Sequence, residues 1–225
     1  MSSTGPARPG AGDSDARSRR ATLQPRARAT RLAILTAAAE HFARNGYRAT
    51  SLDSVLADSG GTKGALYFHF PSKEALARAV IAEMMQSWRG LREQVDGRGL
   101  DPLSALLALV DEMITQLIDN PIARGGMRLL NDLPMRARDT PGPYSVSEDD
   151  VLALLTQSAQ AGLLRAGIDP APLARQIVAV IAGHRQICEA VDSRHHLRQR
   201  LEEAWNLLLP AIASDAWLAA RRAGR

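Results

Sequence analysis

The chain has 225 residues, of which 45% are hydrophobic and 23% are charged, values typical of a globular protein that buries a core. No apolar run approaches the roughly 18 residues needed to cross a bilayer, and the N-terminus lacks the apolar stretch of a secretory signal. The single cysteine, Cys188, excludes an internal disulfide framework. We therefore expect a soluble cytoplasmic protein with no membrane contact.

The positive charge is concentrated at the N-terminus. The formal net charge is +4, and the first thirty residues contain six arginines against two aspartates. A basic flexible arm on a near-neutral body is suited to binding a polyanion such as nucleic acid. A solvated tail without a partner is the alternative interpretation.

Residues 1–27 are rich in Gly, Pro, Ser, Arg and Ala and show no periodicity, which predicts a disordered basic arm. A helical period begins at Thr30 and ends at Asn45-Gly46. Thr50 then opens a second short helix, with Asp53 as its capping-box acid.

Thr62 is the expected cap of a third, very short helix. Within it we expect Leu66, Phe68 and Phe70 to face a small core. Pro71-Ser72 ends this unit and starts a longer helix.

The rest of the chain continues with helical apolar spacing, interrupted at 132–147 by a Pro- and Gly-containing stretch that predicts a mobile loop or linker. No segment alternates like a strand, so the predicted fold is all-α, with about nine helices and no internal repeat. The sequence divides into an arm at 1–27, a small helical domain at 28–75 and a larger helical domain at 76–220.

Three short helices joined by a Gly-containing turn predict a helix-turn-helix, whose third helix enters the DNA major groove. Lys63, on the first turn of that helix, can reach a phosphate or a guanine edge. Gly64 and Ala65 are small enough for close approach to the bases. Tyr67 and His69 would present their polar tips to the DNA backbone.

At this point the sequence resembles a known family. Residues 31–77 look like the TetR family of bacterial repressors, above all in the stretch TKGALYFHF at 62–70 and in SKEAL at 72–76. The form of the first motif is similar to that of the γ-butyrolactone receptor subgroup. Weaker similarities lie at 124–129, at Pro143-Tyr144 and at 183–185.

The resemblance implies a homodimer that binds a pseudo-palindromic operator in double-stranded DNA, in association with the nucleoid, and releases it when a small hydrophobic ligand binds. Gly61 departs from the family pattern, which usually has a larger apolar residue there. The DNA-contacting positions of the family correspond in this sequence to Thr50, Thr62, Lys63, Tyr67 and His69. The last two helices would pair with their two-fold mates through Ile177, Ile181, Leu201, Trp205 and Leu208, some of which could face the pocket instead.

Apolar residues of the central helices are the candidate ligand-binding residues, because a pocket needs an apolar wall with a few polar groups. The candidates are Trp88, Met113, Leu117, Met127, Leu130, Tyr144, Leu155 and His184. The receptor subgroup typically carries a tryptophan near the position of Ser147, whereas this sequence has none between Trp88 and Trp205. A receptor for a γ-butyrolactone and a pseudo-receptor or multidrug-type regulator for an antibiotic or biosynthetic intermediate therefore both stay open.

Two other classes of function are remote alternatives. His184, Cys188 and Asp192 follow each other at four-residue spacing, which could place metal ligands together, but the surrounding stripe is apolar and favours a buried cysteine. An enzyme is not expected, because the sequence has no Gly-rich phosphate loop, no Gly-x-Ser-x-Gly elbow and no inward pair of carboxylates. We expect neither a cofactor nor a metal.

Overall fold

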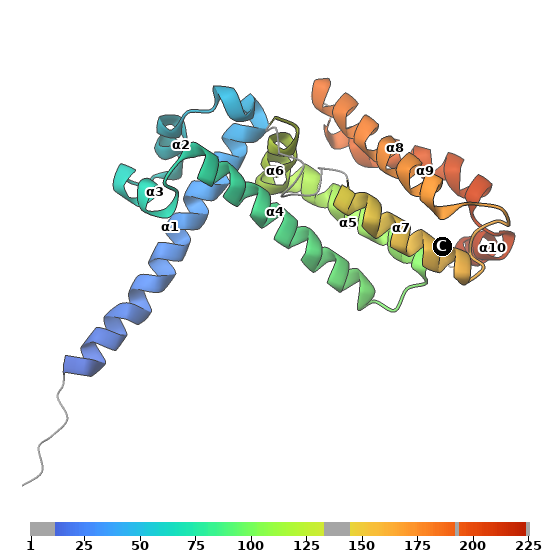
Figure 1. The fold of residues 1–225 in the computed structure, drawn as a ribbon, viewed down its shortest axis with the longest axis horizontal. Coiled ribbons are helices and arrows are strands. Elements are labelled where there is room, and N and C mark those ends of the chain that lie inside the picture. The colour runs from blue at the N-terminus through green and yellow to red at the C-terminus, as the bar shows by residue number, and fades with distance from the viewer. Residues whose placement is uncertain (1–11, 133–144, 192–193, 224–225) are drawn as a thin grey trace, which may run out of the picture.

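The computed structural model describes residues 12–132, 145–191 and 194–223, and describes side chains from residue 25 onward except at 145–147. This part of the chain is helical without a strand, which confirms the predicted all-α fold, with ten α-helices in place of about nine (Figure 1). The elements are α1 (Gly12–Ala49), α2 (Leu52–Ser59), α3 (Lys63–His69), α4 (Lys73–Asp96), α5 (Pro102–Asp119), α6 (Pro121–Asp132), α7 (Ser145–Gln160), α8 (Pro170–Ala190), the 3₁₀ helix η1 (Arg194–His196), α9 (Leu197–Ile212) and α10 (Asp215–Ala223).

Helix α1 begins much earlier than the sequence predicts. Residues 12–27, expected to be part of a disordered arm, are helical and run through Pro25 into the rest of α1. In Figure 1 this N-terminal half of α1 extends away from the body of the protein. The prediction gave too much weight to Pro25 and to the charge, whereas Ala, Arg, Leu and Gln, which dominate the stretch, are strong helix formers. Residues 1–11 of the predicted arm lie outside the described residues.

Helices α2 and α3 pack against α1, as a helix-turn-helix unit requires (Figure 1). Their shared core is apolar and almost fully buried. It contains Ile34, Leu35, Phe42, Val55, Leu66 and Phe70. Removal of this apolar surface from water is the main force that holds three such short helices together.

Side-chain caps set where the short helices begin. The hydroxyl oxygens of Ser51, Thr62 and Ser72 each accept a hydrogen bond from the backbone N–H three residues later, at 3.0–3.2 Å. Each cap satisfies one of the free N–H groups at a helix N-terminus. The expected caps at Thr62 and Ser72 are confirmed. The expectation that Thr50 opens the second helix is wrong by one residue, because Ser51 is its cap.

Helix α4 leads from the helix-turn-helix unit into a second bundle, in which α7 packs on α5 and α8, and α8 packs on α9. Most of the loop predicted at 132–147 lies outside the described residues, and residues 145–147 form the first turn of α7. Among the described helices, none is both long and apolar enough to cross a membrane.

Helix α6 is wedged between α1 and α4 through two adjacent glycines. A Cβ atom added to Gly125 would lie 2.5 Å from the backbone oxygen of Ala39 in α1, and one added to Gly126 would lie 2.6 Å from Sδ of Met84 in α4. The backbones of α6 and α1 therefore touch directly. Only glycine permits such close approach.

The C-terminal end of α6 is also attached to α1. The Oδ2 atom of Asp132 accepts a hydrogen bond from the backbone N–H of Tyr47 at 2.8 Å. This N–H lies just after Gly46, whose positive φ of 73° breaks the helical geometry of α1. Helix α6 is therefore held against α1 both at its middle and at its end.

We expect Gly125→Ala to reduce the free energy of unfolding by about 1–3 kcal/mol, since an extra methyl in a filled space forces the backbone apart. Urea unfolding followed by circular dichroism measures the change. Gly90→Ala in α4 is the matched control, because nothing lies within 4 Å of its Cβ position and alanine is the better helix former. Equal stability of the two variants would contradict the close contact between α6 and α1.

Candidate DNA-binding surface and ligand pocket

The exposed side of α3 carries most of the residues predicted to bind DNA. Thr62, Lys63, Gly64 and Tyr67 are exposed, and nothing lies within 4 Å of the Cβ position of Gly64. This side therefore offers an ammonium group, a hydroxyl at the helix start and a stretch of open backbone. Ala65 and His69, also among the predicted contacts, are half-buried at the edge of the same side.

Phe68 is 81% exposed, so the prediction that it faces the core is wrong. Leu66 and Phe70 are buried as predicted, and in a helix a residue two positions from a buried one points to a different side. Phe68 lies instead beside Tyr67 on the solvent side of α3, where its ring is in edge contact with His69. An exposed aromatic ring there adds an apolar group of the kind that contacts thymine methyls.

Thr50 does not belong to this exposed surface. Its side chain is 3% exposed, and its hydroxyl donates to the backbone oxygen of Gly46 at 2.8 Å. The hydroxyl of Thr50 therefore closes the turn after α1, and a contact of Thr50 with DNA stays a prediction. Ser51, the actual cap of α2, is exposed.

The second lysine of the chain, Lys73, holds two helices together. Lys73 donates from Nζ to the backbone oxygen of Arg48 at 3.1 Å and lies 4.7 Å from the centre of the Tyr47 ring. Partial burial lowers the pKa of Lys73. The start of α4 is thus anchored to the last turn of α1.

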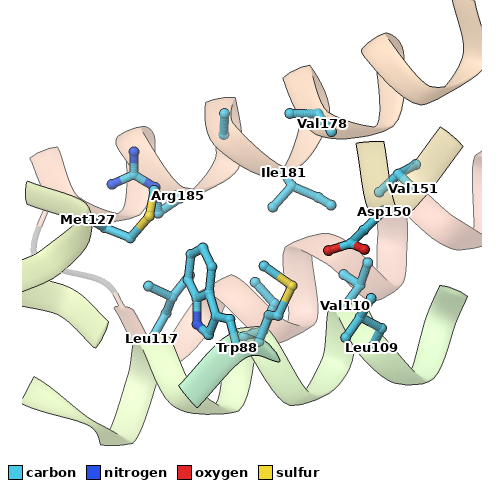
Figure 2. A pocket seen from close by; sticks show the side chains of 13 residues that line it. Trp88, Leu109, Val110, Leu117, Met127, Asp150, Val151, Val178, Ile181 and Arg185 are labelled. Atoms are coloured by element: carbon cyan, nitrogen blue, oxygen red, sulfur yellow. The ribbon is translucent and has the colours of Figure 1, made fainter. Parts of the chain in front are cut away.

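An apolar cavity of about 60 Å³ lies between α4, α5, α6, α7 and α8 (Figure 2). Four of the predicted ligand-binding residues line it, namely Trp88, Met113, Leu117 and Met127. The other lining residues are Leu109, Val110, Ile114, Asp150, Val151, Val178, Ile181, Ala182 and Arg185. The volume is well below the roughly 300–1,000 Å³ of pockets that hold drug-sized ligands.

Two charged residues interrupt the apolar wall. Figure 2 shows Asp150 at one end of the cavity and Arg185 beside Met127 at the other. Arg185 is 3% exposed and donates to Glu189 at 2.6 Å, while Asp150 accepts from Arg92 at 3.2 Å. Burial raises the pKa of Asp150, and the positive charge of Arg92 opposes that rise without cancelling it. The sequence analysis missed both residues, because spacing along one helix does not reveal convergence between helices.

The remaining predicted pocket residues do not line this cavity. Leu130 and Leu155 are buried core residues, and Tyr144 lies outside the described residues. His184 is half-buried beside the lining residue Arg185, and its Nδ1 atom is buried without a hydrogen-bond partner in the described structure. Leu130, Leu155 and His184 lie on α6, α7 and α8, which also line the cavity, and this is why the sequence did not separate them from the lining residues.

The residues of the metal-sensing alternative lie only partly within the described structure. Cys188 is 1% exposed and packs in the core, while Asp192 lies outside the described residues. Within the described part of the chain, no three His, Cys, Asp or Glu side chains gather closely enough to hold a metal ion.

The predicted dimer residues differ in accessibility. Ile177 and Leu201 are buried within the protomer, Ile181 lines the cavity, and Trp205 and Leu208 are half-buried. Three exposed apolar residues were not among the predicted ones. They are Ile187 in α8, Val191 just after α8 and Leu207 in α9, which are 49%, 61% and 79% exposed. Ile177 and Leu201 are thus core positions of the protomer, and the predicted dimer contacts stay predictions.

Comparison with known proteins agrees with this architecture. Residues 34–80 match the family described as bacterial regulatory proteins, tetR family. Over 196 residues the chain is 33% identical to the A-factor receptor protein of Streptomyces griseus, covering 87% of this chain and 68% of that protein. The chain therefore belongs to the TetR family of DNA-binding transcriptional regulators, which is a non-enzymatic family.

Within this family the chain is related to the γ-butyrolactone receptors. A crystal structure of a γ-butyrolactone receptor described as ArpA-like superposes with a TM-score of 0.75 at 31% identity, covering 86% of this chain and 93% of the other. CprB of Streptomyces coelicolor, in complex with its operator sequence, superposes with a TM-score of 0.76 at 32% identity, covering 87% and 94%.

The raised pKa of Asp150 predicts a pH-dependent stability. A carboxyl group with a raised pKa in the folded state stabilises the fold while it is protonated, below its unfolded pKa of about 3.9, and this contribution is lost as pH rises through the folded pKa. As pH rises from about 3.5 to 7, wild type should therefore lose stability relative to Asp150→Asn. Urea unfolding of both proteins across this range measures the difference.

Glu202→Gln, which removes one negative charge from an exposed residue of α9, controls for the change in net charge. A difference between wild type and Asp150→Asn that stays constant with pH, or that changes in the opposite direction, would contradict the raised pKa.

Proposed function

We propose that this protein is a ligand-responsive repressor that leaves its operator when a small hydrophobic signal such as a γ-butyrolactone enters the apolar cavity. The observation that supports the proposal most directly is that α4 runs from the helix-turn-helix unit to the wall of the cavity. The first residue of α4, Lys73, is bonded to the last turn of α1, and Trp88, four turns later, forms a wall of the cavity. A ligand that displaces Trp88 would therefore tilt the helix that supports the helix-turn-helix unit.

The walls of the cavity favour an amphipathic ligand. An apolar interior suits an alkyl chain, and a few polar groups fix its orientation. Trp88 has an indole N–H that is buried and lacks a hydrogen-bond partner in the described structure, so it can donate to a carbonyl oxygen of the ligand. A pseudo-receptor or multidrug-type regulator is the second candidate, since no tryptophan lies between Trp88 and Trp205.

The operator-binding form in this proposal is a homodimer. The three exposed apolar residues Ile187, Val191 and Leu207, together with the half-buried Trp205 and Leu208, give α8 and α9 an unpaired apolar face. A two-fold pairing there places two α3 helices on the DNA and requires a pseudo-palindromic operator. In this arrangement residues 28–75 form the DNA-binding domain, and residues 76–220 bind the ligand and form the dimer.

The difference in binding free energy that the ligand must supply to release DNA is modest. A ligand that binds the DNA-free conformation about 100-fold more tightly contributes about 2.7 kcal/mol per site. Burial of a short alkyl chain, at about 0.8 kcal/mol per CH₂ group, supplies energy of this order.

Fluorescence anisotropy on a labelled duplex from the protein's own upstream region tests the proposal. We would add a panel of synthetic γ-butyrolactones and an extract of the producing strain. Release of specifically bound duplex by a lactone would support the receptor function, and release by the extract alone would support the pseudo-receptor. Specific binding that neither addition reverses would contradict a ligand-responsive repressor of this gene.

Filling the cavity should uncouple the response to ligand from DNA binding. Val151→Phe adds an aromatic ring where Val151 lines the cavity, and we expect at least a tenfold higher ligand concentration for release with unchanged operator affinity. Leu152→Phe, at the half-buried neighbouring residue outside the lining, is the matched control. Equal ligand responses of the two variants would place the ligand elsewhere.

Lys63→Ala should weaken operator binding by about 1–3 kcal/mol if Lys63 reads a base edge, with folding and ligand affinity intact because Lys63 is exposed. Arg222→Ala in α10 removes the same charge from an exposed site far along the chain and should have little effect. Anisotropy titrations at fixed salt concentration compare them. If Lys63→Ala bound the operator with unchanged affinity, the prediction that α3 lies at the DNA interface would be wrong.

A further inference from the structure

A second cavity, with a volume of about 450 Å³, lies apart from the apolar one and shares no residue with it. It lies between the helix-turn-helix unit and the larger domain, because its walls come from α1, α6, α8 and η1. Its lining residues are Glu40, Ala43, Arg44, Arg124, Arg128, Glu189 and Arg194.

The cavity has an excess of positive charge. Four guanidinium groups face two carboxylates of the lining. Both carboxylates already have partners on their own helices, and Arg128 also pairs with Asp132, outside the lining, at 3.3 Å. Glu40 pairs with Arg44 at 3.0 Å, and Glu189 pairs at 2.6 Å with Arg185, which is outside the lining. The negative charge of Glu189 is therefore directed mainly at an arginine outside the cavity.

Arg124 is the residue whose bonding is least complete. One of its terminal nitrogens donates to the backbone oxygen of Ile118 at 2.7 Å, whereas its Nε–H is buried and has no hydrogen-bond partner in the described structure. A buried donor without a partner costs about 1–3 kcal/mol, and more when it is charged. The site therefore lacks an acceptor next to Arg124.

The electrostatic environment of Arg124 agrees with its bonding. Burial lowers the pKa of the Arg124 guanidinium, and the positive charge of Arg194 lowers it further, while Glu40 acts in the opposite direction. Arginine stays protonated in proteins, so the shift expresses an unfavourable energy rather than a loss of the proton. A bound anion would relieve this energy.

We propose that this cavity is a binding site for a phosphorylated small molecule, with Arg124 as its central ligand and Arg44, Arg128 and Arg194 around it. Guanidinium groups bind phosphate oxygens through paired, charge-assisted hydrogen bonds. A phosphate group offers three acceptor oxygens and up to two charges, which suits arginines that converge from several elements better than a planar carboxylate does. The volume falls within the roughly 300–1,000 Å³ of small-molecule sites.

The position of the cavity gives such a ligand a structural effect. Arg44 belongs to α1, and Arg124 and Arg128 belong to α6, the helix whose Gly125 touches the backbone of α1. A phosphate between these arginines would tie α1 and α6 together. It should therefore raise the melting temperature of the protein.

The proposal is tested by calorimetric titration of the full chain without DNA at constant ionic strength. The probes are inorganic phosphate, pyrophosphate, ADP and malonate. We expect saturable binding of one phosphate compound per protomer, accompanied by a higher melting temperature. Tighter binding of ADP than of pyrophosphate would identify a nucleotide as the source of the phosphate, and the reverse order would identify a free phosphate compound.

Arg124→Gln should weaken this binding at least tenfold, and Arg44→Gln, at a largely exposed position, should weaken it several-fold without risk to folding. Arg222→Gln in α10 removes the same charge elsewhere and should leave binding unchanged. Equal binding by all variants, no saturable binding, or a preference for malonate would overturn the proposal. It would also be overturned if Arg124→Gln lost operator affinity and the wild type bound no phosphate compound, because the cavity would then be a contact for DNA phosphate.

Discussion

The contact between the backbones of α6 and α1 at Gly125 is the constraint on which the rest of the structure depends. A methyl group added at Gly125 would lie only 2.5 Å from the Ala39 backbone oxygen, so α6 has little room to slide or rotate against α1, because packed interiors have little free volume. Gly126 gives the same close fit against Met84 of α4. The helix-turn-helix unit is thus connected to the larger domain through the packing of α6 as well as through the continuous helix α4.

Five consecutive residues of α6 face different parts of the protein. Arg124 and Arg128 face the polar cavity, Met127 faces the apolar cavity, and the two glycines between Arg124 and Met127 hold α6 against α1 and α4. Occupancy of either cavity therefore acts on the same mechanical element. Two chemically different ligands would be thermodynamically linked through it, and such linkage is reciprocal.

The helix-turn-helix could be predicted from sequence because its signals are local. Thr62 caps α3, Leu66 and Phe70 are buried, and Lys63 is exposed, as expected. The errors at Thr50 and Phe68 arose where one residue of register decides which side of a short helix is buried. The cavities were harder to predict, since Asp150 and Arg185 come from helices that only the tertiary fold brings together. Met127 and Leu130 look alike in sequence, and only the first lines the apolar cavity.

The small size of the apolar cavity has a kinetic consequence. At about 60 Å³ it has room for a few water molecules, so a signalling molecule has to part the helices before it fits. Encounter with the closed form is then unproductive, and the association rate follows the fraction of time the bundle spends open. The measured affinity is reduced by the same fraction. Under the proposed function, the repressor would respond slowly to its ligand, and the ligand concentration needed for release would depend on how firmly α5, α7 and α8 pack as well as on the contacts of the ligand.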